Sequence, residues 1–548
     1  MTKFIVVTGG VISSLGKGIT SASLALLLNL RGLKTTIIKM DPYINPDAGL
    51  MSPYEHGEVF VTHDGGETDL DLGNYERFLD HELSKENNIT TGKVYLDVLE
   101  KERNGEYLGK TVQVIPHITD NIKERVNKIG KEFQIVIIEV GGVVGDIENI
   151  PFIEALRQIY LENKHSMIFL HLALVPFLDH IGENKTKPVQ HSVRELLSKG
   201  IQPDLLLCRC RSTLTFEQKK KISMFCNVSM DDVFVSYDAP DKYFVPDALR
   251  KQNLETKIIS KLGFLNYDKL DFVQWEKMLL RLNKLDKQPT VVLGLIKKYT
   301  AVDNYVSLEE ALKHAAIKAN INLKILHINS EDSDIEQQIK DVNGVLVPGG
   351  WGTRGIQGKI RAIQFARENN LPFLGICYGF QLAAIEYAQN VLKLEGAMST
   401  EIEPQTKTPV IIDLNTIISL QKQKSSLMKI SSKLRLGSRK VKLLENSLIS
   451  KIYASKNTSL ERFRHRYTLN PEYIQAFEKG GIKFTGFGPE DQAKIVDVLE
   501  LPSSRFFLGV QYHPEYKTQI FHPHPIFSNF ILAMEEYVDR VVDSKKED

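Results

Sequence analysis

The chain has 548 residues, of which 42% are hydrophobic and 25% are charged, and its formal net charge at pH 7 is +1. This length and composition predict a globular protein with two or more cores rather than a single domain. The balanced charge argues against nucleic acid or membrane binding through a general electrostatic field, so small-molecule partners are expected. The first predicted strand begins near residue 3 with no charged and apolar leader before it, which favours a cytoplasmic protein.

The loop at residues 9–18, GGVISSLGKG, lies between the apolar run KFIVV and a helix-like segment. Strand, glycine loop and helix in this order predict a phosphate site, with backbone N–H groups and Lys17 facing the anion. The loop departs from the Walker pattern because Val11 replaces the first glycine and Gly18 replaces the hydroxyl residue that holds magnesium. The metal would therefore need other ligands. The alternative is an ordinary glycine-rich turn between a strand and a helix.

Helical and strand-like segments alternate from residue 119 to 210 and again from residue 290 onward. Such alternation predicts parallel sheets covered by helices, so the expected fold class is α/β with two doubly wound parallel-sheet domains. The apolar run at 166–178 is too short for a membrane span and is predicted to be a buried strand. The predicted divisions of the chain are a first domain at 1–267, a linker helix at 268–289, a second domain at 290–540 and a charged tail at 541–548.

Two local features of the second half complete this prediction. Ser307 and Glu310 have the spacing of a capping box and predict a helix start. Residues 404–460 are irregular and rich in Lys and Ser, and only a partly β insertion is expected there.

Four cysteines occur, Cys208, Cys210, Cys226 and Cys377, without a CxxC pair, which suits a reducing compartment. Cys208 and Cys210 lie in a strand-like run and are expected to be core residues. Cys377 is different because GICYG places it on a sharp strand-to-helix turn with glycines two residues to either side, as in a nucleophile elbow. A buried structural thiol is the alternative for this cysteine alone.

A base for Cys377 is found in the run GVQYHPEY, where His513 and Glu515 are two residues apart. On a strand both side chains would face the same way, so the carboxylate would orient the imidazole that deprotonates the thiol. The predicted catalytic residues are therefore Cys377, His513 and Glu515.

This combination resembles the class I glutamine amidotransferases, and the resemblance implies an oxyanion-hole N–H near Gly350 in the run PGGWG. Trp351 departs from the usual phenylalanine of the family, and Tyr378 and Phe380 replace the leucine and methionine of CLGMQ. The family implies glutamine contacts at Gly350, Tyr378, Gly379, Phe380, Gln381, Glu401 and Arg466.

Further strings, including KMDPYIN, EHGEVFVTHDGGETDLDLGNYERF, EVGGVVGDIE and KTKPVQHSVREL, are similar to the CTP synthase family from about residue 3 to 530. The resemblance implies that ATP contacts Ser14, Leu15, Gly16, Lys17, Gly18, Ile19 and Asp71. It implies that UTP or CTP contacts Ser13, Asp146, Ile147, Glu148, Lys185, Thr186, Lys187, Pro188, Val189, Gln190 and Lys221.

The chemistry of these residues agrees with the resemblance. Lys17 and Lys39 can neutralise phosphate charge, and Asp71 and Glu139 offer the hard oxygen ligands that Mg²⁺ prefers. The alternatives are a helix cap for Asp71, a solvated strand end for Glu139 and a solvated helix start for Lys185 and Lys187. His56 is expected near the acceptor or the exit for ammonia.

The family implies that ATP phosphorylates O4 of UTP and that ammonia from L-glutamine then displaces the phosphate to form CTP. It also implies GTP as an allosteric activator, CTP as a feedback inhibitor and a homotetramer. Ammonia is mostly protonated at neutral pH, so a sheltered passage between the two sites is expected. Two alternatives are an amidoligase of another acceptor and a non-catalytic scaffold or filament-forming relative.

Overall fold

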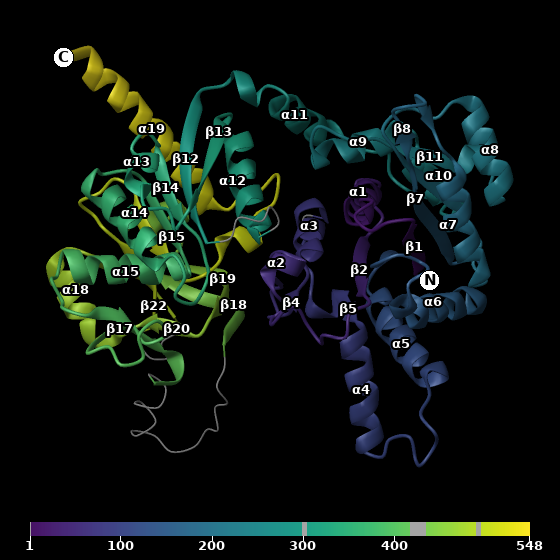
Figure 1. Ribbon diagram of the computed structural model, residues 1–548, viewed down its shortest axis with the longest axis horizontal. Helices are drawn as coiled ribbons and strands as arrows, with labels where there is room; N and C mark the ends of the chain where they lie inside the picture. Colours follow the sequence, from purple (N-terminus) through teal and green to yellow (C-terminus); the bar gives the residue numbers. More distant parts are fainter. Residues whose placement is uncertain (1, 80, 299–303, 417–433, 489–494, 548) are drawn as a thin grey trace. The chain divides into compact units, whose positions relative to one another are not determined.

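The computed structural model describes residues 2–79, 81–298, 304–416, 434–488 and 495–547. The chain forms two compact units (Figure 1). The first comprises residues 1–50 and 71–279, and the second comprises residues 51–70 and 280–548. The predicted linker lies around this division, but the helix there, α11, is shorter than expected and covers only Val273–Leu282.

The first unit is built on a seven-stranded sheet in the order β11-β10-β7-β1-β6-β2-β5. All of its strand pairs are parallel. The strands are β1 (Lys3–Gly10), β2 (Thr35–Asp41), β5 (Asn88–Thr90), β6 (Ile135–Val140), β7 (Met167–Val175), β10 (Leu205–Cys210) and β11 (Val233–Ser236). Nearly every residue of β1, β6 and β7 is buried, as expected for central strands covered on both faces. The buried strand predicted at 166–178 and the burial of Cys208 and Cys210 are confirmed.

Helices connect these strands. They are α1 (Lys17–Asn29), α3 (Leu70–Leu79), α4 (Thr91–Arg103), α5 (Thr119–Gly130), α6 (Ile150–Glu162), α7 (Lys187–Ser198), α8 (Phe216–Cys226), α9 (Val245–Arg250) and α10 (Leu254–Lys261). A two-stranded ribbon, β8 (Phe177–Leu178) with β9 (Glu183–Asn184), precedes α7. The glycine loop therefore lies at the carboxyl end of β1, the edge at which α/β sheets bind their ligands.

The second unit contains a nine-stranded sheet in the order β13-β12-β14-β15-β23-β22-β21-β18-β19. Its first five strands are parallel, and they are β12 (Thr290–Lys297), β13 (Asn322–Asn329), β14 (Gly344–Val347), β15 (Phe373–Ile376) and β23 (Phe507–Val510). The other four pair antiparallel, and they are β18 (Arg435–Leu443), β19 (Thr458–His465), β21 (Lys483–Phe487) and β22 (Val496–Glu500). The α/β prediction is confirmed for both units, but the second sheet is parallel only over half its width.

The remaining elements of the second unit surround this sheet. They are α2 (Pro53–His56), β3 (Phe60–Val61), β4 (Glu67–Thr68), α12 (Val306–Ala319), α13 (Ile335–Ile339), α14 (Ile356–Glu368), α15 (Tyr378–Asn390), β16 (Ala397–Ser399), β17 (Thr408–Asp413), α17 (Leu448–Ile452), β20 (Tyr467–Leu469), α18 (Ile474–Gly480) and α19 (Pro525–Glu547). The predicted insertion at 404–460 lies partly outside the described residues, but β18 and part of β19 from it join the main sheet. The predicted tail is helical through residue 547.

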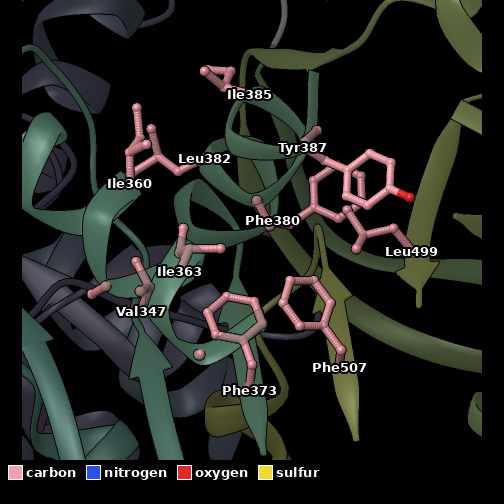
Figure 2. Packing of buried hydrophobic residues seen from close by; sticks show 14 of the residues in the cluster. Val347, Ile360, Ile363, Phe373, Phe380, Leu382, Ile385, Tyr387, Leu499 and Phe507 are labelled. Carbon is pink, nitrogen blue, oxygen red and sulfur yellow. The ribbon is translucent and has the colours of Figure 1, made fainter. Parts of the chain in front are cut away.

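One core of this unit lies between the sheet and the helices α14 and α15 (Figure 2). Phe373 and Phe507 come from neighbouring strands with ring centroids 4.5 Å apart, and Ile363 and Phe380 reach them from the two helices. This packing fixes α15, the helix that begins directly after Cys377, against the sheet.

The segment at 51–70 packs with the second unit through contacts that local sequence patterns do not reveal. Oε2 of Glu58 accepts a hydrogen bond from the backbone N–H of Ser307 at 2.7 Å. The predicted capping box is wrong, because α12 begins at Val306 with Tyr305 in the N-cap position. A distant carboxylate thus satisfies an N–H at this helix start, a role that a local Ser or Glu usually performs.

None of the helices in the described part of the chain is both long and apolar enough to cross a lipid bilayer.

Candidate active site

Cys377 lies on the turn between β15 and α15 with φ 51° and ψ −97°, a left-handed conformation that costs energy for a residue with a side chain. A Cβ built on Gly375 would lie 2.7 Å from the carbonyl oxygen of Gly379, and one built on Gly379 would lie 2.1 Å from the carbonyl oxygen of Val347. Both glycines are therefore required by close backbone approach. The predicted geometry of a nucleophile elbow is present.

His513 and Glu515 lie beside this turn, with 2.7 Å between Nδ1 of His513 and Oε1 of Glu515. They are not on a strand as predicted, because β23 ends at Val510 and Pro514 begins a short 3₁₀ helix through Lys517. Proline lacks the N–H that a sheet ladder needs, so the chain turns here. The ring of Tyr516 stacks on the imidazole with centroids 4.9 Å apart. The two-residue spacing predicted that the two side chains would meet because both lie on a strand. They do meet, but a turn brings them together.

The environment of His513 favours its charged form. Burial lowers the pKa of this imidazole, but the Glu515 carboxylate and the Cys377 sulfur outweigh it and raise the pKa to about 10. A Cβ built on Gly349 would lie 2.8 Å from Cε1 of His513, so only glycine fits beneath the ring. A charged imidazole beside the sulfur is the arrangement found at nucleophilic cysteines.

Two contacts to Cys377 were not predicted from the sequence. Nε2 of Gln511 lies 3.7 Å from Sγ of Cys377, and the thiol lies 3.7 Å from the carbonyl oxygen of Arg464. Gln511 is two residues before His513 in the run GVQYHPEY. This run is the sequence feature from which Gln511 could have been identified. Gln511 in turn accepts a hydrogen bond from the amide of Gln381 at 3.3 Å.

A small cavity of about 80 Å³ opens at Cys377 within the second unit. Residues of the 51–70 segment form one side of it, among them Glu58 and Val59. His56 ends α2 in the same segment and is not one of the residues that line this cavity. The other lining residues include Gly349, Gly350, Trp351, Cys377, Arg464, His513, Glu515 and Tyr516.

The residues predicted to bind the substrate glutamine divide into two groups. Tyr378 donates a hydrogen bond to the carbonyl oxygen of Gly352 at 2.5 Å, and the N–H of Gly352 donates to Glu401 at 3.0 Å. The Arg466 guanidinium acts electrostatically on Glu401, whose pKa is nevertheless raised by burial. These residues surround the segment that follows β14.

The second group points inward. Gln381 donates to the carbonyl oxygen of Tyr467 at 2.8 Å, while its own Oε1 is buried with no hydrogen-bond partner among the described residues. The ring of Phe380 belongs to the hydrophobic core (Figure 2). Phe380 therefore supports α15 through packing, and its side chain does not line the cavity at Cys377.

In the first unit, Lys39 lies between two of the predicted acidic residues. Its Nζ lies 3.0 Å from Oε1 of Glu139 and forms an ion pair with Asp71. Burial lowers the pKa of Lys39, but the carboxylates of Asp71 and Glu139 outweigh it and raise the pKa well above the usual range. Tyr75 donates a hydrogen bond to the other oxygen of Glu139. The predicted lysine and acids are thus brought together at the carboxyl ends of β2 and β6.

Lys17 lies at the start of α1, and its Nζ donates to the carbonyl oxygen of Gly142 at 2.6 Å. Burial lowers the pKa of this amine, and Glu139 and Asp71 partly oppose that effect. In the loop before it, Ser14 and Gly16 have φ of 58° and 88°, and residues 11–14 are exposed. Ser13 and Ser14 are therefore accessible, whereas Leu15 is buried.

The close approach of the Asp71 carboxylate explains why residue 18 is a glycine. A Cβ built on Gly18 would lie 2.6 Å from Oδ1 of Asp71 and 3.5 Å from Oε2 of Glu139. The carboxylates occupy the space in which a Walker serine or threonine would place its hydroxyl. Two carboxylates beside a phosphate loop match the donors that Mg²⁺ uses together with substrate phosphates, although no group of three or more His, Cys, Asp or Glu side chains suited to a metal occurs among the described residues.

The predicted pyrimidine-nucleotide residues lie on two segments of the first unit. On one, Lys185 pairs with Glu183 at 2.7 Å, and Nε2 of Gln190 donates to Thr186 at 3.2 Å. Lys187, Pro188 and Val189 form the first turn of α7. Lys221 on α8 is exposed and acts electrostatically on Glu183.

The other segment follows β6 and carries Asp146, Ile147 and Glu148. Oδ2 of Asp146 accepts a hydrogen bond from the N–H of Val143 at 2.9 Å, which closes the turn. Ile147 is 75% exposed, and Glu148 is also exposed. Such exposure leaves both side chains available for a ligand.

A buried histidine connects the end of β1, from which the glycine loop starts, to α7. Nδ1 of His171 lies 2.8 Å from Oγ1 of Thr8, and Nε2 lies 2.6 Å from Oγ of Ser192. A Cβ built on Gly10 would lie 1.7 Å from the same Ser192 oxygen, so the loop and the helix are tightly packed. The sequence did not identify His171, because a single histidine in an apolar strand carries no pattern.

The first unit also contains a cavity of about 580 Å³ at the carboxyl end of β11, which the sequence did not predict. Its lining includes Thr213, Leu214, Ser236, Tyr237, Asp238, Ala239, Pro240 and Phe244. Its place at the carboxyl ends of parallel strands is the usual position of ligand sites in open α/β sheets.

Comparisons with known proteins find a matching family model in each of the two units. Residues 3–264 match the family model of the CTP synthase N-terminus, and residues 300–533 match that of the class I glutamine amidotransferases. The CTP synthase of Pyrococcus abyssi is 50% identical over 543 residues, which is 98% of either chain. That of Clostridium kluyveri is 49% identical over 539 residues, 97% of this chain and 98% of the relative.

Among solved structures, the glutaminase domain of Trypanosoma brucei CTPS with bound acivicin is 31% identical, with a TM-score of 0.41. The match covers 45% of this chain and 94% of that domain. The two family models together account for most of the chain, and the relatives match it along nearly its whole length. This chain therefore belongs to the CTP synthase family, as an enzyme that carries both the synthase and the class I glutamine amidotransferase domain.

Proposed function

We propose that this enzyme aminates UTP to CTP, using ATP to activate O4 of the uracil and L-glutamine as the source of ammonia. The observation that carries the proposal is the pair of separate chemical sites, one in each unit. The second unit has a cysteine on a strained turn beside a carboxylate-held histidine. The first has two lysines and two carboxylates around a glycine loop.

In the second unit, Cys377 attacks the side-chain carboxamide of glutamine, and the C–N bond breaks as the thioester forms and ammonia leaves. Water then hydrolyses the thioester, which releases glutamate and restores the thiol. His513 supplies the proton that the leaving nitrogen needs, and Glu515 keeps the imidazole oriented and charged. The N–H of Tyr378, the residue after the nucleophile, and an N–H near Gly350 are the proposed donors to the oxyanion. Gly379, Gln381, Glu401, Arg466 and the backbone of Phe380 complete the proposed glutamine site.

In the first unit, the loop Ser14–Ile19 and Lys17 bind the phosphates of ATP, and Lys39 offsets the charge that develops during phosphoryl transfer. Asp71 and Glu139 are the proposed ligands for Mg²⁺, which when bound neutralises phosphate charge. O4 of UTP attacks the γ-phosphorus and ADP leaves. Ammonia then adds at C4 and inorganic phosphate departs, which gives CTP.

The triphosphate of UTP is proposed to bind Ser13, Lys185–Gln190 and Lys221. The exposed side chains of Lys187 and Lys221 and the helix start of α7 offer positive charge there. Asp146, Ile147 and Glu148 are proposed to contact the base of CTP as a feedback inhibitor. The cavity at the end of β11 is large enough for the base and ribose of a nucleotide and is the proposed place for those of ATP.

The remaining parts of the proposal come from the family. They are activation of the glutaminase by GTP, a homotetramer as the active assembly, and a cytoplasmic location. The four unpaired cysteines support the location, since they suit a reducing compartment.

The test is to incubate the purified enzyme with UTP, ATP, Mg²⁺ and glutamine labelled with ¹⁵N in its amide, and to analyse the nucleotides by mass spectrometry. The proposal expects CTP with ¹⁵N in its exocyclic amine and one ADP for each CTP. Glutamine hydrolysis without CTP would indicate an amidoligase of another acceptor. Absence of both glutamate and CTP would favour a non-catalytic relative.

A further inference from the structure

Lys359 is a fully buried lysine in the second unit, at the start of α14. Its Nζ has no hydrogen-bond partner in the described structure. An ammonium group in such a place usually pairs with a carboxylate or a carbonyl, because an unpaired buried charge is costly. A residue of this kind needs an explanation outside simple packing.

The contacts of Lys359 are with the predicted oxyanion site. Its Nζ lies 5.3 Å from the centroid of the Tyr378 ring, within the range of a cation–π interaction. A Cβ built on Gly350 would lie 3.9 Å from the same Nζ and 3.8 Å from Cδ1 of Tyr378. Lys359 is thus adjacent to both residues whose N–H groups are expected to receive the oxyanion.

The neighbouring segment is held on its other side by three further contacts. Tyr378 donates to the carbonyl oxygen of Gly352, Glu401 accepts from the N–H of Gly352, and Lys298 donates to the carbonyl oxygen of Trp351 at 3.0 Å. These contacts fix Trp351 and Gly352. The ammonium group of Lys359 faces the Tyr378 ring and lies close to Gly350.

We propose that Lys359 is a positioning residue of the glutaminase: its buried ammonium group, held against the Tyr378 ring, keeps Gly350 and Tyr378 in the arrangement that receives the oxyanion. Tyr378 stands where the usual CLGMQ motif of the family has leucine. The inference rests on the proposed role of Cys377 as the glutaminase nucleophile.

Lys359 loses its charge near neutral pH, so the proposal predicts a pH dependence of glutamine hydrolysis that can be measured. Burial, and then the positive charge of Lys298, lower the pKa of Lys359 to about 7. Among the residues that the structure describes, Tyr378 on α15 also faces it, and burial raises the pKa of that hydroxyl. The amine is therefore charged below about pH 7 and neutral above it, so the cation–π contact weakens as the pH rises.

The test compares glutamine hydrolysis by the wild-type enzyme, Lys359→Met, Tyr378→Leu and the double variant from pH 6 to 9. Met matches the length and volume of the lysine without its charge. At pH 6.5 we expect Lys359→Met to lower kcat by about tenfold with little change in KM, because the oxyanion exists only in the transition state. The fall in wild-type kcat near pH 7 should be absent from the variant.

The double variant should lose less than the product of the two single losses, since the residues act as a pair. Lys340→Met, at an exposed lysine of the same unit, is the matched control and should behave as the wild type. CTP formation from ammonium chloride should be unchanged in Lys359→Met. Wild-type kcat and an unchanged pH profile in Lys359→Met, or multiplicative losses in the double variant, would overturn the proposal.

A second measurement uses the wild-type enzyme alone, so the proposal does not depend on a variant that folds. Alkylation of Cys377 by iodoacetamide reports the thiolate without using the oxyanion site. We expect its rate to show no fall near pH 7 while the kcat of hydrolysis does, and parallel pH profiles would overturn the proposal. A wild-type enzyme that releases no glutamate would instead contradict the proposed function of Cys377.

Discussion

Oε1 of Glu515 lies 2.7 Å from Nδ1 of His513, and this contact holds the buried imidazole in its charged form beside the sulfur of Cys377. With Nδ1 engaged, Nε2 is the ring nitrogen left to exchange a proton with the thiol or the leaving nitrogen. The pKa of His513 is raised to about 10, so the imidazolium is retained across the neutral range and is lost only as the pH rises through that value.

Glu515→Gln removes the carboxylate that keeps His513 charged while preserving its size. We expect glutamine hydrolysis at pH 7 to fall on the order of a hundredfold. The rate of Cys377 alkylation by iodoacetamide should also fall at pH 7, because the sulfur loses the charged imidazole that assists it as a nucleophile. Glu478→Gln, at an exposed glutamate of α18, is the control, and an unchanged alkylation profile in Glu515→Gln would contradict this assignment.

Lys17→Ala should reduce CTP formation by about a hundredfold or more, whether glutamine or ammonium chloride supplies the nitrogen, because no other cation occupies that position beside the phosphates. Asp71→Asn should act similarly and should require more Mg²⁺ for half-maximal rate. Glutamine hydrolysis should persist in both. Lys131→Ala, at an exposed lysine of the same unit, is the control, and parent-like turnover of UTP with ammonia in Lys17→Ala would show that this loop is not the phosphoryl-transfer site.

Glu148→Ala should weaken inhibition by CTP while the KM for UTP changes little. Substrate and product differ at position 4 of the base, and an exposed carboxylate suits the exocyclic amine of cytosine. Loss of one charge-assisted hydrogen bond costs about 1.5–3 kcal/mol, or about ten- to a hundredfold in affinity. Titration of CTP at fixed UTP measures the effect, and an unchanged inhibition constant would remove Glu148 from the product site.

His171 should make the first unit sensitive to acid. Burial, and then the charge of Lys17, lower the pKa of this imidazole to about 3, so between pH 6.5 and 3 the unfolded chain binds a proton that the folded chain does not. Stability should therefore fall through that window by up to about 1.4 kcal/mol per pH unit from this group. His171→Gln should unfold more easily at neutral pH but with a shallower dependence on pH.

Urea unfolding followed by Trp275 fluorescence measures this effect. Trp275 is buried in the first unit and donates to the carbonyl oxygen of Tyr243 at 3.0 Å. The chain has two tryptophans, so a Trp351→Phe background isolates the signal. Equal slopes of stability against pH in the presence and absence of His171 would show that this imidazole is not neutral in the folded protein.

Periodic segments were predictable from the sequence because their burial is a local pattern. The strands β6 and β7 follow from apolar runs, and the turn at Cys377 follows from an apolar run that ends in closely spaced glycines. The start of α12 was not predictable, since Glu58, which lies far away in sequence, accepts from its first turn. For the same reason no local pattern assigns residues 51–70 to the second unit.

In the candidate site, too, local patterns were predictable from the sequence and contacts between distant residues were not. The spacing of His513 and Glu515 predicted that they meet, although Pro514 makes the segment a turn instead of a strand. The reason for Gly18 became apparent only with Asp71 in place, because a glycine gives no sign of the atom it makes room for. Lys359 likewise has no recognisable motif, and its burial against Tyr378 arises from the packing of two helices.

We propose that nitrogen release and nitrogen transfer occur at separate sites, and Cys377→Ala tests this separation most directly. CTP formation by this variant should be measured with glutamine and with ammonium chloride as alternative nitrogen sources. We expect no detectable CTP from glutamine and a rate from ammonium chloride within about twofold of the wild type, because the thiol serves only the release of ammonia. Loss of both activities in a folded variant, or CTP formed from glutamine at the wild-type rate, would contradict the account.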